Sequence, residues 1–96
     1  MINLLTFRLL DGVDEADFIA ADARLQTEFA NLQPGMVRRT TARGDDGGWA
    51  VFTLWASADA AEAVAAASGA NEVVAQFLAL VDRDTLSVTQ YHELEG

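Results

Sequence analysis

The hydrophobic positions in the first third of the chain predict a strand followed by a helix. Residues 2–10 form a dense apolar run that stops at Asp11-Gly12, which is typical of a central strand. From Glu15 to Leu32, apolar residues recur at spacings of three and four, which predicts an amphipathic helix. Asp14 suits the start of this helix, because its carboxylate can accept a free backbone N–H, and Pro34-Gly35 ends it.

The middle of the chain predicts a β-hairpin. Residues 36–43 are rich in arginine and threonine, which suits an edge strand because charged side chains discourage pairing with another chain. Glycines and aspartates at 44–48 predict the turn. Residues 49–55 place apolar side chains on both faces, which predicts a strand that is buried on both sides.

The alanine-rich segment after the hairpin predicts a helix in two parts. Ser57 can cap the first part, Gly69 interrupts it, and Asn71 can cap a continuation that contains the apolar Phe77. The expected inner face of the first part consists of Ala60, Val64 and Ala67.

The last segment predicts a final strand. The Asp-Arg-Asp sequence at 82–84 is expected to end the helix, and residues 85–94 then alternate strictly. This alternation predicts a half-buried strand, on which Leu86, Val88, Gln90, His92 and Leu94 share one face.

The order of elements predicts an α+β fold in one domain over residues 1–96. A β-α-β-β-α-β order with right-handed crossovers is ferredoxin-like, with both helices on one face of a four-stranded antiparallel sheet. The bare face of that sheet would expose large apolar side chains in a monomer. We therefore expect a twofold homodimer that pairs two sheets face to face and closes a dimeric α/β barrel.

Composition narrows the classes of partner. The net charge is −9, which disfavours nucleic acid and anionic membrane surfaces as partners, since both attract basic proteins. The chain has no cysteine, so thiolate metal sites and cysteine nucleophiles are excluded. The first residues lack the basic region and cleavage site of a signal peptide, and we expect a cytoplasmic protein.

Three short segments carry a family resemblance, namely 33–39 (Gln-Pro-Gly-Met-Val-Arg-Arg), 47–49 (Gly-Gly-Trp) and 54–57 (Leu-Trp-Ala-Ser). Together they resemble the antibiotic-biosynthesis-monooxygenase-like group of dimeric α/β-barrel proteins. The resemblance implies a pocket between the helices and the sheet. In some members it also implies oxygenation without a metal or an organic cofactor, in which an electron-rich phenol or quinol itself reduces oxygen.

Haem-degrading members of the group use an asparagine, a tryptophan and a histidine. Trp55 matches the tryptophan, whereas the asparagine position falls near Leu5 and the histidine position near Ala75 or Gln76. Two of the three residues are missing, so haem degradation is not expected, and no cofactor is expected.

His92 is the candidate catalytic residue. It is the single histidine of the chain, and an imidazole is a suitable general base because its ordinary pKa lies near neutral. The alternative is a solvated or interfacial histidine at a strand end. Nothing in the sequence has metal-ligand spacing, so no metal site is expected.

Four residues are candidates for the substrate pocket: Trp55, Gln90, Phe77 and Arg38. Trp55 has an alternative as plain core beneath the second helix. Arg38 and Arg39 occupy opposite faces of one strand, so at most one points into the fold. An arginine there could hold an anionic group of the substrate, and its alternative is a surface ion pair.

Three functions remain open from the sequence. The first is a cofactor-independent monooxygenase acting on a small aromatic or polyketide-like molecule. The second is a non-enzymatic dimer that binds small molecules or is associated with stress, and the third is an interaction protein without a cavity. The first needs an enclosed apolar pocket that contains a polar group able to assist the reaction.

Overall fold

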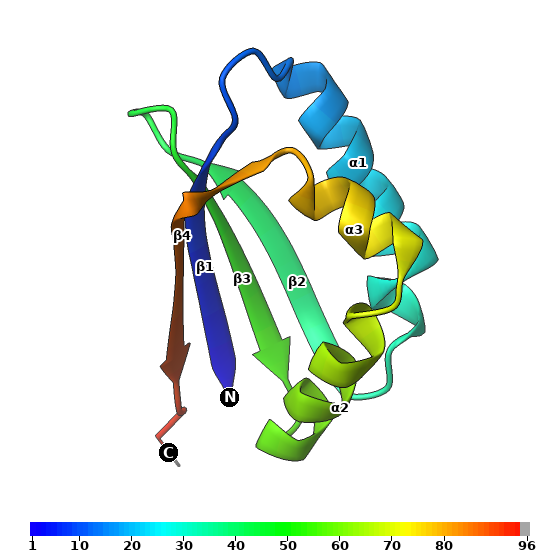
Figure 1. The fold of residues 1–96 in the computed structure, drawn as a ribbon. Helices are drawn as coiled ribbons and strands as arrows, with labels where there is room; N and C mark the ends of the chain where they lie inside the picture. Colours follow the sequence, from blue (N-terminus) through cyan, green and yellow to red (C-terminus); the bar gives the residue numbers. More distant parts are fainter. Residues whose placement is uncertain (95–96) are drawn as a thin grey trace.

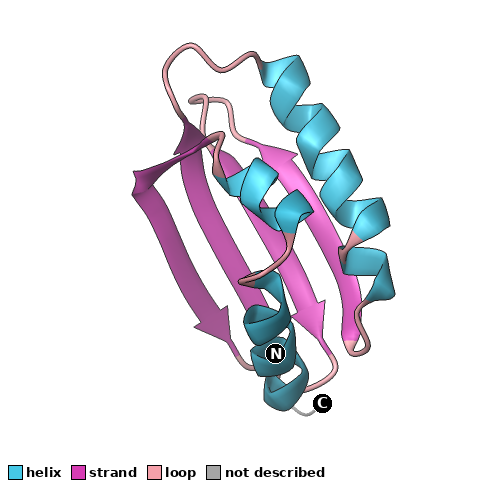
Figure 2. Ribbon diagram, turned by 45° about the vertical axis from the view of Figure 1, so that its right-hand side comes forward, coloured by secondary structure: helices cyan, strands magenta, loops and turns pink. Residues whose placement is uncertain are grey.

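A computed structural model describes residues 1–94 and has a sheet with helices against one of its faces (Figures 1 and 2). The elements are β1 (Ile2–Leu9), α1 (Glu15–Glu28), a 3-10 helix η1 (Ala30–Leu32), β2 (Met36–Arg43), β3 (Trp49–Trp55), α2 (Ala58–Ser68), α3 (Glu72–Leu78) and β4 (Val81–Tyr91). This confirms the predicted β-α-β-β-α-β order, with the second helix divided into α2 and α3.

The sheet is four-stranded, with the order β2-β3-β1-β4, and neighbouring strands are antiparallel. The two strands with the most apolar sequences, β1 and β3, lie in its centre, as predicted. β2 is an edge strand, which agrees with its arginines and threonines. Figure 1 shows β4 at the opposite edge, away from the helices.

The predicted helix caps are present. The side chain of Asp14 accepts a hydrogen bond from the backbone N–H of Ala16 at 3.0 Å, and Ser57 accepts one from Ala60 at 3.1 Å. Asn71 accepts from two backbone N–H groups, at 2.9 and 3.1 Å. Gly35 ends the first helical region with a positive φ of 85°, a conformation that glycine adopts without steric cost.

Several boundaries differ from the prediction. α1 ends at Glu28, and the predicted last turn is the separate η1. Residues 82–84 lie within β4 rather than at a helix end, because the β1–β4 register shifts between Thr6 and Arg8 and accommodates extra residues of β4. The buried residues of α2 are Ala61 and Val64, whereas Ala67 is exposed.

The side of the sheet that faces the helices holds two hydrophobic clusters. In one, Phe18 is fully buried and its ring lies 4.7 Å from that of Trp49 and 5.2 Å from that of Phe77, between centroids. In the other, Trp55 packs against residues of α2. The chain therefore has one aromatic hydrophobic cluster around Phe18 and a second cluster between α2 and the end of β3.

The other face of the sheet is uncovered within one chain. β3 was predicted to be buried on both sides, yet Phe52 is 45% exposed, because the helices cover one face only. β4 was predicted to be half-buried, but most of it is exposed, because the helices do not extend over that edge. Among the described helices, none combines the length and hydropathy needed to cross a membrane.

Candidate functional site

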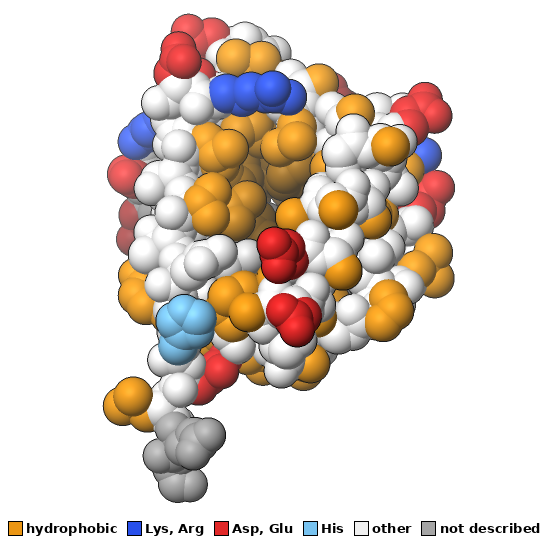
Figure 3. Space-filling model, turned by 60° about the horizontal axis from the view of Figure 1, so that its bottom comes forward, with side chains coloured by type: hydrophobic (Ala, Val, Ile, Leu, Met, Phe, Trp, Pro, Cys, Tyr) orange, Lys and Arg blue, Asp and Glu red, His pale blue; other side chains and the backbone are white. Residues whose placement is uncertain are grey.

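A cavity of about 260 Å³ lies between the sheet and the helices. Its lining is mostly apolar and comes from β1, β2 and β3 on one side and from the helices on the other. Seen from below, the molecule is hollowed at this place, with hydrophobic side chains around the hollow (Figure 3). A largely apolar cavity with a few polar groups is the usual form of a small-molecule site.

One row of polar side chains crosses the sheet under this cavity. Arg39 of β2 pairs with Thr53 of β3, Thr53 pairs with Asn3 of β1, and Asn3 pairs with Gln90 of β4. Residues paired in this way share a face of the sheet. The first three line the cavity, and Gln90 lines the adjoining opening. The row therefore runs from the β2 edge of the cavity to its mouth.

Two buried polar atoms at this site lack a hydrogen-bond partner within residues 1–94. They are Oδ1 of Asn3 and Nε1 of Trp55, and both residues line the cavity. A buried polar group without a partner costs about 1–3 kcal/mol, so native structures rarely retain one without reason. The amide oxygen accepts and the indole N–H donates. A ligand with a hydroxyl and a carbonyl oxygen could therefore pair with both.

Arg39 is the charged residue in the cavity lining, and its side chain is only 6% exposed. Its guanidinium donates to Oδ1 of Asp22 at 2.7 Å, and the hydroxyl of Thr41 donates to the same oxygen at 2.8 Å. The guanidinium carbon also lies 5.7 Å from the ring centroid of Phe77. These contacts fix the position of the cation beside the cavity.

A second hollow, of about 390 Å³, forms the mouth of the cavity. The two share Asn3, Ala61 and Ala65, and the mouth also includes Gln90 and His92. In Figure 3 the histidine side chain lies on the same face of the molecule, below the hollowed region.

An ion pair lies next to the mouth. The amino group of Met1 donates to Oε2 of Glu93 at 2.9 Å. This hydrogen bond holds the pKa of the Glu93 carboxyl below its ordinary value. Because Glu93 follows His92, its carboxylate contributes negative charge to this end of the site.

The structure places four of the five predicted site residues at this cavity. Trp55 and Phe77 line the cavity itself, and Gln90 and His92 line the mouth. Arg38 is the exception: it lies on the uncovered face of the sheet, in a shallow hollow with Thr40 and Phe52.

The register corrects the choice between the two arginines. It shifts between Met36 and Arg38 and then pairs Arg39 with the cavity residue Thr53. Alternate residues of a strand point to opposite faces, so Arg39 enters the cavity and Arg38 does not.

Asn3 was not among the predicted site residues. The asparagine position of the haem-degrading proteins was expected near Leu5, which lines the same cavity two residues further along β1. Asn3 could have been identified from the sequence, because it is a polar residue within the apolar run 2–10 and lies two residues from Leu5, on the same face of the strand. The strand pairing was needed to bring Asn3 opposite Thr53 and close to Trp55.

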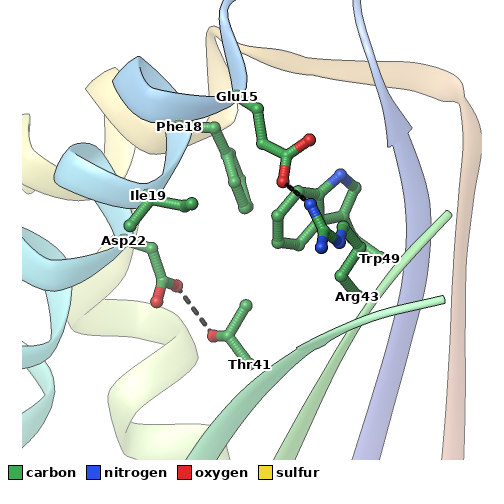
Figure 4. Close-up of a pocket in the computed structure, with 7 residues that line it drawn as sticks. All are labelled: Glu15, Phe18, Ile19, Asp22, Thr41, Arg43 and Trp49. Carbon is green, nitrogen blue, oxygen red and sulfur yellow. Dashed lines mark hydrogen bonds and ion pairs between the residues drawn. The ribbon is translucent and has the colours of Figure 1, made fainter. Parts of the chain in front are cut away.

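A separate groove of about 370 Å³ lies between α1 and the β2 edge, and Figure 4 shows its lining. Its charged side chains are already engaged. Arg43 forms an ion pair with Glu15, and Asp22 binds Thr41 and Arg39. The unpaired atoms of the cavity make it the stronger candidate site. Residues 1–94 contain no group of three or more His, Cys, Asp or Glu side chains placed to hold a metal.

Comparison with known proteins gives similarity at the level of structure. No family model matches the sequence, and no curated protein matches it. SnoaB from Streptomyces nogalater, described as a cofactor-independent oxygenase, superposes with a TM-score of 0.79 at 24% identity, covering 99% of this chain and 93% of SnoaB.

Two candidate antibiotic biosynthesis monooxygenases are also similar in structure. The protein from Chloroflexus aurantiacus has a TM-score of 0.67 at 17% identity, covering 99% of this chain and 96% of its own. The protein from Nitrosomonas europaea has a TM-score of 0.72 at 14% identity, covering 98% of each chain. This chain therefore has the fold of the antibiotic-biosynthesis-monooxygenase-like proteins.

Proposed function

We propose that this protein is a cofactor-independent monooxygenase that acts on a small aromatic or polyketide-like phenol. The observation that carries the proposal is the apolar cavity that contains the unpaired Oδ1 of Asn3 and Nε1 of Trp55. The description of SnoaB as a cofactor-independent oxygenase supports it, because the two structures match over nearly their whole length. Fold alone does not define an activity, so the site residues must carry the argument.

The reaction balances without a cofactor when the substrate is a phenol with an activated CH₂ group. Loss of a proton from the CH₂ carbon gives an anion that is delocalised into the ring. This anion transfers an electron to O₂, and the resulting carbon radical and superoxide combine into a peroxide. Reprotonation and loss of water then leave a carbonyl, so that CH₂ + O₂ gives C=O + H₂O. The substrate supplies all the electrons that O₂ accepts.

The residues of this chain supply orientation and proton transfer. Asn3 and Trp55 hold the oxygens of the substrate, and the apolar walls exclude water from the anion and the peroxide. His92 at the mouth accepts the proton from the CH₂ group and returns it to the peroxide.

The first prediction is that phenols and quinols bind and are oxidised. A ligand present at about 100 times its Kd stabilises the fold by about 2.7 kcal/mol, which a thermal-shift screen detects. With a phenol that carries an activated CH₂ group, an oxygen electrode is expected to record one O₂ consumed per carbonyl formed, without added metal or flavin.

The variant for this test is Trp55→Phe, which keeps an aromatic side chain and removes the N–H together with the five-membered ring. Loss of one hydrogen bond worth about 0.5–1.5 kcal/mol should weaken ligand binding up to about tenfold. Binding without oxygen consumption by any ligand of the panel would contradict the enzyme and favour a small-molecule-binding protein.

The uncovered sheet face supports a second part of the proposal, a homodimer. Large apolar side chains pair across this face, Ile2 with Leu54 and with Tyr91, and Leu4 with Phe52. Phe52 and Tyr91 are 45% and 50% exposed in one chain. A second copy that presents the same face would cover them, and a twofold axis needs only one self-complementary surface.

The dimer leads to the second prediction. Phe52→Glu is expected to weaken self-association at least about 30-fold, because a central aromatic contact is worth about 2 kcal/mol and the new carboxylate would be buried without a partner. Sedimentation velocity over a concentration series measures the dissociation constant. The matched control is Ile19→Glu, since Ile19 is 52% exposed on α1 and should leave association unchanged. A wild-type protein that remains monomeric at high concentration would refute the homodimer.

A further inference from the structure

Arg39 is a cation enclosed in an acidic protein. The chain has a net charge of −9, yet the side chain of Arg39 is 6% exposed and lines the cavity. α1 packs against it with Asp22 and Gln26, and α3 packs against it with the ring of Phe77. A charged side chain is rarely buried to this extent unless it is paired or has a ligand.

The guanidinium has donors that remain for a ligand. Arginine carries five N–H groups and no acceptor. Within residues 1–94, one terminal nitrogen donates to Asp22 at 2.7 Å and the other to Gln26 at 3.4 Å. The Nε–H and one N–H on each terminal nitrogen have no hydrogen bond among these residues. Because the side chain lines the cavity, a ligand oxygen there can accept from them.

Asp22 orients Arg39 without filling the cavity. The carboxylate lies on α1, outside the cavity lining, and the hydroxyl of Thr41 holds the same oxygen that Arg39 binds. Thr41 and Arg39 are two residues apart and therefore lie on the same face of β2. The pair is thus a preorganised donor group, of the kind that binds a charge with little rearrangement.

We propose that Arg39 binds the ionised oxygen of a phenolic ligand at the β2 side of the cavity, so that the site selects molecules bound as phenolates. This inference rests on the proposed function and deepens it, because negative charge on the ring oxygen makes the molecule a stronger electron donor to O₂ once the CH₂ proton has left. The ligand then extends along the polar row past Thr53 to Asn3. Arg39 and Asn3 are two strand spacings apart, about 9.5 Å, which favours a fused-ring phenol over a single ring.

The charges around the bound oxygen decide whether it ionises more readily or less readily than in the free ligand. Arg39 favours the anion, and Asp22 behind it opposes the anion. From the mouth, Glu62 of α2 and His92, which directly follows β4, face the same space at the far end of the polar row. Met1 also lines the mouth, and its amino group is paired with Glu93. The part of α3 that lines the cavity contributes only Val74, Phe77 and Leu78, which carry no charge. Arg39 is the nearest charge to the proposed oxygen position.

The test is a spectroscopic titration of 2-hydroxyanthraquinone bound to the full chain, because ionisation of this phenol changes its visible absorption. In the wild-type protein the bound probe should ionise at a pH at least one unit below that of the free probe, a tenfold shift. Arg39→Gln should abolish the shift, and Asp22→Asn should enlarge it. The matched control is Arg38→Gln, one residue away on the opposite face of the sheet, which should leave it unchanged.

Arg39→Gln leaves the partly buried Asp22 without its cation and could fail to fold. The double variant Asp22→Asn/Arg39→Gln removes both charges, and its bound probe should ionise at or above the pH of the free probe. The inference is overturned if the probe does not bind the wild-type protein, or if bound-probe ionisation is the same with and without Arg39. If the bound probe ionises at lower pH but no phenol of the panel leads to oxygen consumption, the proposed oxygenase alone is refuted. If oxygen is consumed but the pH of probe ionisation is not lowered, the role of Arg39 alone is refuted.

Discussion

Replacing Phe18 by alanine is expected to lower the free energy of unfolding by about 3–5 kcal/mol, the usual cost of removing a fully buried phenyl ring. Phe18 has no exposed surface, and its ring contacts Phe7, Trp49 and Phe77 with centroid distances of 5.8, 4.7 and 5.2 Å. These partners come from β1, β3 and α3, so the cavity left behind would lie where three elements meet. A domain of this size has about 5–15 kcal/mol of stability in total.

Urea unfolding followed by circular dichroism measures this effect through the midpoint and the slope of the transition. The control is Ile19→Ala at the next position of the same helix, where the side chain is 52% exposed. A surface change of this kind should alter stability by no more than about 0.5 kcal/mol. Equal losses in the two variants would contradict the assignment of Phe18 to the centre of the core.

Replacing His92 by glutamine is expected to reduce kcat for oxygen consumption about 100-fold, at the lower end of what a general base contributes. Glutamine keeps a polar side chain of similar length and cannot take a proton at neutral pH. Ligand affinity should change little, because His92 lies at the mouth and not among the residues that enclose the ligand. The expected result is therefore a loss in kcat with an unchanged Kd.

The unfolding midpoint and the ligand affinity separate this role from a structural one. A residue that acts only in proton transfer can be replaced without loss of folding or binding. The glutamine variant should therefore lose kcat and keep the wild-type unfolding midpoint and Kd. A variant with wild-type kcat would show that solvent, and not His92, removes the proton. The roles assigned to Asn3, Trp55 and Arg39 do not depend on that result.

The local sequence predicted the fold well because each element carries its own signal. The apolar run at 2–10, the periodic residues of α1 and the capping residues Asp14, Ser57 and Asn71 all act within a few positions of the chain. The errors lie where distant residues decide the outcome. The sequence of residues 82–84 predicted the end of a helix. Instead, β1 pairs with residues 81 and 82, so this segment belongs to β4.

The candidate site was predicted in part for the same reason. Trp55 could be identified from its local motif, and strand alternation brought Gln90 and His92 to one face. The alternation also showed that Arg38 and Arg39 point in opposite directions, but it could not show which one faces the helices. Only the pairing of Arg39 with Thr53 decided that question.

The sequence by itself therefore determined the elements, their order and the apolar character of both sheet faces, because these depend on residue type and short-range spacing. The tertiary structure decided which face the helices cover and which polar atoms the cavity encloses. Asn3, Thr53 and Arg39 lie far apart in the chain, and interstrand hydrogen bonding places them in one row. Strand register is a long-range property, and a shift of one residue would have exchanged the cavity side chains for those of the open face.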